Sequence, residues 1–404
     1  MFYPFPIINN INDVLPAIEG ASEFLVADRG DHTVLNYVVM TPDSFPPVKV
    51  AGGSAKQRAE RSLNNALRRE CRGMIFDNAT GAILRRPYHK FFNLNQIDET
   101  HINKIDLTQP HDIIEKLDGS MIVPYRVNRR VIWGTKMGDT DVCTPVEAFV
   151  KLHPEYLRFF QRCEASNISP IFEWMSRVNR IVIDHPEDRL VLTAMRTITH
   201  GGYMSHKFIT DSAALDGIPA VERFHVGEHT SIEDIMDYIR AQEGTEGVVI
   251  RFDNGHMIKI KSEWYCAIHG AKELITEEKN VVRLIVEEAI DDAKALVLEE
   301  DRENLTRYER DFWSKVNDFA REMTASIIVA RKMFKTRKDF ALRKDKGIHE
   351  VEVAVFRFFD NEVNPTLQEV RQHVIDRIIK PNVNNRTKFT AMKQIVFPGL
   401  RQYL

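Results

Sequence analysis

The chain has 404 residues, which is more than one typical domain and predicts two. An apolar fraction of 43% and a charged fraction of 28% are ordinary for a soluble folded protein and argue against a disordered chain. A formal net charge of −3 excludes a polycation, so any binding of nucleic acid must come from local basic patches.

Cysteine and histidine spacing argues against a zinc ribbon, a metalloprotease site or a disulfide scaffold. The four cysteines lie far apart without a C-x-x-C pair, as expected in a reducing cytosol. His225 and His229 are close in sequence, but Gly227 interrupts their segment and Glu228 is not where an H-E-x-x-H site requires it. With no secretory signal and no long apolar stretch, we expect a cytoplasmic protein without membrane contact.

Strands and turns dominate the first two thirds of the sequence. Apolar residues that alternate around turn residues predict hairpins, and three- and four-residue spacings predict helices. In chain order, the predicted elements are a flexible loop around Gly52 and Gly53, a helix over 59–69, a hairpin over 73–86, a strand pair over 112–137, strands over 171–175 and 189–196, a helix over 231–243 and a hairpin over 247–262.

Helices are predicted for the rest of the chain. Apolar residues recur at helical spacing over 281–297 and again from Leu305 to Ile327. Thr366 and Glu369 form a capping box before a helix that ends ahead of Pro381. The change of pattern near residues 270–280 predicts a mixed domain over 1–272 and an all-helical domain over 273–404.

The motif KLDGS, Lys116 to Ser120, carries the candidate chemistry. Lys116 follows an apolar run at the foot of a predicted hairpin, where its amine could face a pocket. An amine attacks only without its extra proton, and burial or neighbouring cations favour that form. Lys259 and Lys261 alternate with isoleucines on one predicted strand, so they share a face on which they could both favour the neutral amine and neutralise phosphate charge.

Further charged residues of the right type lie near strands. Arg72, Lys90 and Lys136 add cations, which nucleotidyl transfer needs around the phosphates. Glu173 could accept a hydrogen bond from a ribose hydroxyl. Glu246 could hold a divalent cation, either directly or through water.

Six sequence blocks stand in the order found in the covalent nucleotidyltransferase superfamily of ligases and capping enzymes: ECRG, HKFFNLNQ, EKLDGS, FEWMSRVNRIV, EGVVIR and KIKSEWY. The amino-acid sequences of these blocks, across roughly residues 30–270, resemble those of the phage RNA ligase 1 family, which seals breaks in transfer RNA. The resemblance implies ATP as the nucleotide, with Mg²⁺ or Mn²⁺, and an AMP carried on Lys116. It implies an RNA substrate with 5′-phosphate and 3′-hydroxyl ends, such as a broken transfer-RNA anticodon loop.

The resemblance also suggests roles for individual residues. Glu115 would contact the adenine through its backbone, and Phe92 would lie beside the nucleotide. Arg72 and Lys90 would lie near the phosphates and the RNA end. The other matching positions are Tyr37, in a weaker block, Asp118 with Gly119, Lys136, Glu173, Glu246 with Gly247, Lys259 and Lys261.

The implied fold is α+β: a nucleotidyltransferase, or ATP-grasp-like ligase, domain of antiparallel sheets with flanking helices, followed by an all-helical domain. DNA ligases and capping enzymes usually follow their last nucleotide-binding lysines with a small β-barrel, whereas this chain continues with helices. The helical domain would supply RNA specificity. A monomer in the host cytosol of an infected bacterium is expected, with a separate polynucleotide kinase and phosphatase preparing the ends.

Other interpretations of these residues remain open at this point. The chain could be a DNA ligase, a GTP-using capping enzyme or a non-catalytic RNA-binding protein. Lys116 could be a solvated lysine, Glu173 could pair with Arg177 or Arg180, and at least one of Phe91 and Phe92 is expected in the core. The other candidate cations, Arg72, Lys90, Lys259 and Lys261, could be surface charges.

The segment 331–346 is the densest basic stretch, with Phe334 and Phe340 between its charges. It is interpreted either as a solvated helix surface or as an RNA contact, in which the cations meet phosphates and the aromatic rings stack on loop bases.

Overall fold

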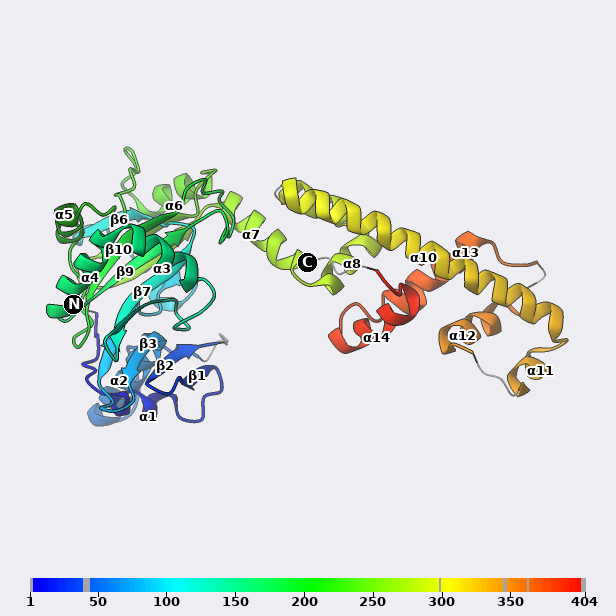
Figure 1. Ribbon diagram of the computed structural model, residues 1–404, viewed down its shortest axis with the longest axis horizontal. Helices are drawn as coiled ribbons and strands as arrows, with labels where there is room; N and C mark the ends of the chain where they lie inside the picture. The colour runs from blue at the N-terminus through cyan, green and yellow to red at the C-terminus, as the bar shows by residue number, and fades with distance from the viewer. Residues whose placement is uncertain (1–2, 39–43, 298, 344–346, 362, 401–404) are drawn as a thin grey trace. The chain divides into compact units, whose positions relative to one another are not determined.

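The computed structural model describes residues 3–38, 44–297, 299–343, 347–361 and 363–400 (Figure 1). The chain forms two compact units, Met1–Cys266 and Ala267–Leu404. The first is built mainly of strands and the second of helices, as the change in sequence pattern predicts. No helix among the described residues is both long and apolar enough to cross a membrane.

Three four-stranded sheets make up the first unit. All neighbouring strands pair antiparallel except β5 and β12, which are parallel. The first sheet has the order β1 (Phe24–Asp28), β2 (His32–Tyr37), β3 (Arg72–Asp77), β4 (Ile83–Arg85). The second is β10 (Arg189–Thr197), β9 (Ile168–Met175), β7 (Ser120–Val127), β8 (Arg130–Gly134), and the third is β5 (Phe92–Asn93), β12 (Met257–Lys261), β11 (Gly247–Phe252), β6 (His111–Glu115).

Helices cover the outer faces of these sheets. Apolar side chains of α4 and α5 join the core of the second sheet, and those of α6 join the core of the third. The helices of this unit are η1 (Ile11–Asp13), α1 (Leu15–Ile18), α2 (Ala55–Glu70), η2 (Asp98–Thr100), η3 (Ile102–Lys104), α3 (Cys143–Leu152), α4 (Pro154–Ala165), α5 (His206–Asp216) and α6 (Ile232–Arg240). Helix α7 (Glu263–Ile275) begins in this unit and continues into the second.

Most predicted elements of the first unit are confirmed. The hairpins β3–β4 and β11–β12 pair antiparallel, and β7 pairs with β8. Lys116 lies just before the confirmed hairpin β7–β8, but the predicted strand that leads into it is two strands, β6 and β7, which belong to different sheets. Lys116 lies in the short connection between β6 and β7, where the chain passes from the third sheet to the second.

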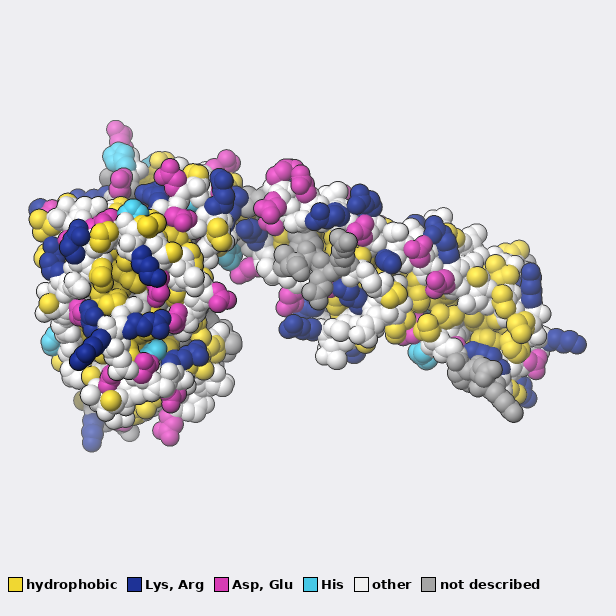
Figure 2. Space-filling model, in the orientation of Figure 1, with side chains coloured by type: hydrophobic (Ala, Val, Ile, Leu, Met, Phe, Trp, Pro, Cys, Tyr) yellow, Lys and Arg dark blue, Asp and Glu magenta, His cyan; other side chains and the backbone are white. Residues whose placement is uncertain are grey.

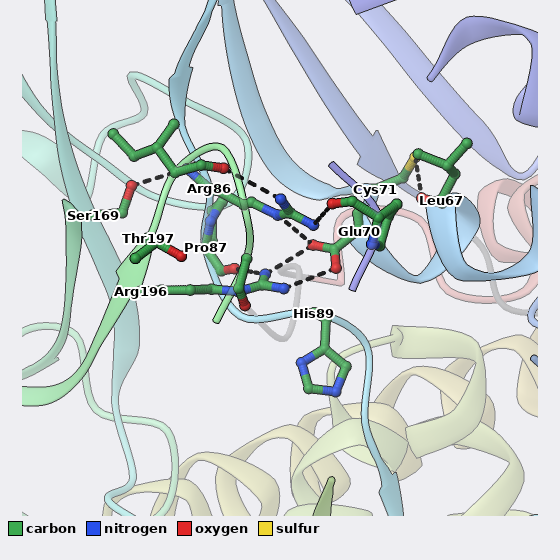
Figure 3. A network of polar contacts seen from close by, with 12 residues as sticks. Leu67, Glu70, Cys71, Arg86, Pro87, His89, Ser169, Arg196 and Thr197 are labelled. Atoms are coloured by element: carbon green, nitrogen blue, oxygen red, sulfur yellow. Dashed lines mark hydrogen bonds and ion pairs between the residues drawn. The ribbon is translucent and has the colours of Figure 1, made fainter. Parts of the chain in front are cut away.

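A buried carboxylate links the first sheet to the second (Figure 3). Glu70, the last residue of α2, accepts from Arg86 Nε at 3.0 Å and from the two terminal nitrogens of Arg196 at 2.8 Å each. All three side chains are buried. Burial opposes ionisation of Glu70, but the two guanidinium groups outweigh it and lower the pKa of the carboxyl to about 2.

The second unit surrounds one apolar core. Its helices are α8 (Glu278–Val286), α9 (Ile290–Leu296), α10 (Glu299–Met333), α11 (Arg337–Leu342), α12 (His349–Phe358), α13 (Leu367–His373), the π-helix η4 (Val374–Ile379) and α14 (Arg386–Val396). The predicted stripe from Leu305 to Ile327 is buried along α10, and Thr366 caps α13 as predicted. The pattern over 281–297 is two helices rather than one, because the backbone turns at Glu288, whose φ is +60°.

In the described part of the basic segment, 331–343, charged and hydrophobic side chains are both exposed, as they are elsewhere on the surface (Figure 2). Phe340 is buried in the helical core and Phe334 packs against it, so the predicted stacking of these rings on RNA bases is wrong. Arg343 pairs with Glu352 at 2.6 Å. Lysines 332, 335 and 338 are exposed and remain available for phosphate contacts, while residues 344–346 lie outside the described part of the chain.

Candidate active site

A cavity of about 470 Å³ lies in the first unit. This volume is within the range of sites that hold a small ligand. Its lining includes side chains from β3, the β6–β7 connection, the turn after β8, and strands β9, β11 and β12. Eight predicted site residues line it: Arg72, Glu115, Lys116, Gly119, Lys136, Glu173, Lys259 and Lys261.

Strand alternation places the two lysines of β12 as predicted. Lys259 and Lys261 line the cavity, whereas Ile258 and Ile260 are buried in the core on the other face. In the ladder with β11, Gly247 is opposite Lys261. The backbone of Lys116 is held beside β11 by a hydrogen bond from its N–H to the carbonyl oxygen of Gly247, at 2.9 Å.

The amine of Lys116 has a carboxylate partner. Lys116 Nζ lies 2.7 Å from Glu246 Oε1, and Lys261 Nζ lies 3.0 Å from the same oxygen. The Glu246 side chain is 5% exposed and that of Lys116 is 22% exposed. The sequence predicts burial and neighbouring cations around the Lys116 amine; in the structure a buried acid also contacts this amine and joins it to Lys261.

Buried contacts hold the KLDGS segment in place. The Asp118 carboxylate accepts from the backbone N–H groups of Val182 and Ile183 at 2.8 and 2.6 Å, and from the Tyr265 hydroxyl at 2.7 Å. Asp118 is therefore an anchor of the segment and does not line the cavity. A Cβ on Gly119 would lie 2.3 Å from the carbonyl oxygen of Trp174, so only glycine fits there.

Glu173 is the second acid of the site. Burial raises its pKa to about 7, with Lys116 lowering it and Glu246 raising it further. The alternative that it pairs with Arg177 or Arg180 is wrong, because both arginines lie beside Asp184. Glu173 is therefore available for a ligand hydroxyl.

Cations gather around the Tyr37 ring. Lys90 Nζ lies 5.2 Å and Lys136 Nζ lies 5.4 Å from the ring centroid. Burial opposes ionisation of Tyr37, but Arg72, Lys90 and Lys136 outweigh it and lower the pKa of the phenol. Tyr37 and Lys90 are not among the lining side chains, but the Tyr37 ring contacts Lys136, which is.

A second ring, Phe91, lies between two further cations of the group. The guanidinium carbon of Arg72 is 5.6 Å and Lys259 Nζ is 5.5 Å from its centroid. Burial, followed by repulsion from Arg72 and Lys90, lowers the pKa of Lys259 to about 7. The position predicted for Phe92 is wrong: it is 3% exposed in the core of the first sheet, and Phe91 lines the cavity instead.

We call Arg72, Lys90, Lys136 and Lys259 the cation cluster. None of the four forms an ion pair with a carboxylate among the residues that the structure describes. Like charges held this close repel one another unless an anion lies between them. A polyphosphate meets that requirement, because its charge is spread over several oxygens.

The acids of the site fit a metal that arrives with a nucleotide. Described residues contain no group of three or more His, Cys, Asp or Glu side chains able to hold a metal. Magnesium in phosphoryl-transfer sites commonly takes one or two carboxylates together with substrate phosphates. Glu173 and Glu246 could supply those carboxylates. A metal contact at Glu246 stays a prediction, since that side chain is bonded to two lysines here.

Several lining residues were not predicted. Tyr88, Thr193, Val249, Arg251 and Met257 also line the cavity. Val249, Arg251 and Met257 follow from strand alternation once Lys259 is placed, because they lie on the same face of β11 and β12. Tyr88 and Thr193 carry no such signal, since their segments belong to other parts of the fold.

Residues 70–265 match the family model described as RNA ligase. A protein of Thermovibrio ammonificans, provisionally named RNA ligase, is 28% identical over 270 residues, which cover 65% of this chain and 64% of that protein. RNA ligase 1 of bacteriophage TS2126 is 24% identical over 301 residues, which cover 70% of this chain and 68% of the phage protein. An archaeal ATP-dependent RNA ligase structure is 15% identical, with a TM-score of 0.41, covering 68% of this chain and 64% of that one. The family match contains every lining residue of the cavity, from Arg72 to Lys261.

Proposed function

Because the chain belongs to the phage RNA ligase 1 family, we propose that it is an ATP-dependent RNA ligase that joins a 5′-phosphate to a 3′-hydroxyl. The observation that carries this proposal is the position of Lys116, which lines the cavity together with Arg72, Lys136, Lys259 and Glu173, and whose amine contacts the buried Glu246. A binding protein needs cations, but it does not need a lysine amine held against a buried carboxylate.

In the first step, the Lys116 amine attacks the α-phosphate of ATP and pyrophosphate leaves. The amine must lose a proton, and Glu246 Oε1, at 2.7 Å, is placed to accept it. Lys259 and Lys261 stabilise the charge that develops on the phosphate oxygens, and Arg72 with Lys136 takes the leaving pyrophosphate. A divalent cation bound with the nucleotide would screen the phosphates beside Glu173 and Glu246.

Two further steps complete sealing. The 5′-phosphate of an RNA end attacks the lysyl-bound AMP, which passes to the RNA and frees the Lys116 amine. A 3′-hydroxyl then attacks the activated phosphate, a phosphodiester forms and AMP leaves. Glu173 orients the adenosine through a ribose hydroxyl, and Glu115 presents its backbone to the adenine.

The proposal also covers the natural substrate and the partner enzymes. A broken anticodon loop of a transfer RNA is the substrate class that the family resemblance favours. The helical unit would then bind the RNA body, with the exposed lysines of 331–346 at its phosphates. A separate kinase and phosphatase would supply the 5′-phosphate and 3′-hydroxyl ends. We expect the ligase to act as a monomer in the host cytosol.

Incubation with ATP labelled at the α-phosphate and a divalent cation tests the proposal directly. The purified chain should become labelled, and the label should move to a 5′-phosphorylated oligoribonucleotide before the sealed product appears. GTP should not substitute, and nicked duplex DNA should be sealed more slowly than RNA ends. Salt-sensitive RNA affinity without any protein-bound AMP would instead identify a non-catalytic binder.

Raising the pH above 7 should weaken ATP binding. In the protein without ATP, Lys259 has a pKa of about 7. A bound polyphosphate favours the charged form of this amine, so ATP binding above pH 7 is coupled to uptake of a proton. Affinity should be constant below pH 7 and fall by up to about tenfold per pH unit above it. Titration with a non-hydrolysable ATP analogue measures this slope. Lys259→Arg, which keeps its charge at every pH used, should reduce the slope to the part caused by ionisation of Glu173, whose pKa is also about 7; an equal slope in both proteins would contradict the assignment.

A further inference from the structure

Arg85 is fully buried and makes an unusual set of hydrogen bonds. It is the last residue of β4 and is 0% exposed. Its guanidinium donates twice to the carbonyl oxygen of Gly73, at 2.8 and 3.0 Å. It also donates to the carbonyl oxygens of Val123, Gly134 and Thr135, at 2.8, 3.1 and 2.7 Å. One side chain thereby bridges three strands and the turn after β8.

Two of these acceptors adjoin members of the cation cluster. Gly73 follows Arg72, and Thr135 precedes Lys136. The two backbones also touch: Gly73 has a φ of +91°, and a Cβ on it would lie 2.6 Å from the carbonyl oxygen of Lys136. The spacing between Arg72 and Lys136 is therefore set by the Gly73 contact and by the Arg85 fork that ties both segments together.

The charge of Arg85 has no carboxylate partner among the described residues. Burial lowers its pKa to about 10, so it remains charged at neutral pH. A buried charge is costly unless its hydrogen bonds are satisfied, and here carbonyl dipoles alone satisfy it. Arg86, which follows Arg85 in the chain, pairs with Glu70, whereas Arg85 adds a fixed positive charge bonded to the backbone next to Arg72 and Lys136.

We propose that Arg85 is a positioning residue for the nucleotide reaction. It holds Arg72 and Lys136 at the separation that the leaving pyrophosphate requires, and it touches neither ATP nor RNA. The inference rests on the proposed ligase function. It concerns the ATP-dependent step, because pre-adenylated RNA brings no pyrophosphate to the site.

Arg85→Lys and Arg85→Met test the proposal in the full chain. The lysine variant keeps the charge but cannot reach four carbonyl oxygens, and the methionine variant loses both. Each should raise the KM for ATP in self-adenylylation and slow that step by about tenfold to a hundredfold, because misplaced catalytic groups lose rate at this scale. Sealing of pre-adenylated RNA, measured on the same folded protein, should change by less than about threefold.

Ile132→Ala is the matched control. Ile132 is buried in the same small core as Tyr125, whose ring packs on Arg85, but it forms none of the Arg85 hydrogen bonds. Ile132→Ala should lose about as much thermal stability as the Arg85 variants, but its adenylylation should not be selectively slowed. If the Arg85 variants slow both reactions equally, or behave like Ile132→Ala, Arg85 is merely structural. If the unaltered chain forms no protein-AMP, the proposed function fails instead.

Discussion

Replacing Lys116 with alanine should abolish the protein-AMP label and lower ATP-dependent sealing by more than about 10³-fold, the scale on which loss of a covalent nucleophile acts. Lys261 is bonded to the same oxygen of Glu246, but it projects from β12 and its backbone position differs from that of Lys116. It therefore cannot replace the missing amine. Labelling with α-labelled ATP measures the first effect, and sealing of a 5′-phosphorylated oligoribonucleotide measures the second.

Two further variants separate the nucleophile from its charge. Lys116→Arg keeps a cation beside Glu246 but has no amine able to form a stable phosphoamide, so it should also remain unlabelled. Lys151→Ala, at an exposed position on α3, should be labelled like the unaltered chain. Pre-adenylated RNA bypasses the nucleophile, so Lys116→Ala should still seal it measurably. Label on Lys116→Ala would show that another residue carries the AMP.

Local sequence pattern was enough to place much of the site. Alternation on one strand put Lys259 and Lys261 on a common face, and the six blocks supplied Lys116 and Glu173 to one cavity, with Glu246 bonded to the Lys116 amine. The same alternation does not reveal which face of a short strand meets the core. Phe92 on the two-residue β5 therefore went into the core and Phe91 into the cavity.

Contacts between segments that are far apart in the chain could not be predicted from the sequence. Lys116 bonds to Glu246 because β6 and β11 are neighbours in one sheet, although 130 residues separate the two side chains in sequence. The doublet Arg85–Arg86 looks like a charged strand end, yet both side chains are 0% exposed and face different partners. In the helical unit, a left-handed residue at Glu288 interrupts a continuous apolar pattern, and periodicity does not detect a single backbone angle.

Replacing Glu70 with alanine should lower the free energy of unfolding by about 3–5 kcal/mol, because it leaves two buried guanidinium groups without a counter-ion. The shift of the Glu70 pKa from 4.5 to about 2 gives a similar scale, about 3 kcal/mol. Activity should fall as well. Glu70 lies two residues before Arg72, and Arg196 also donates to the carbonyl oxygen of Pro87, near Lys90. Denaturant unfolding measures the stability, and Glu164→Gln, in the partly exposed pair with Arg126, should cost only about 0–1 kcal/mol.

The pH dependence distinguishes this ion-pair network from packing alone. The folded-state pKa of Glu70 lies below its ordinary value, so its contribution to stability is fully present above about pH 4.5 and is lost as the pH falls towards 2. Glu70→Gln keeps the size of the side chain but cannot ionise, so its unfolding free energy should lack that part of the acid-induced decline. The difference between the two proteins should therefore be largest near neutral pH and shrink below pH 4.5. A difference that stays constant down to pH 2 would mean that shape and hydrogen bonding, and not the charge, hold the two arginines in place.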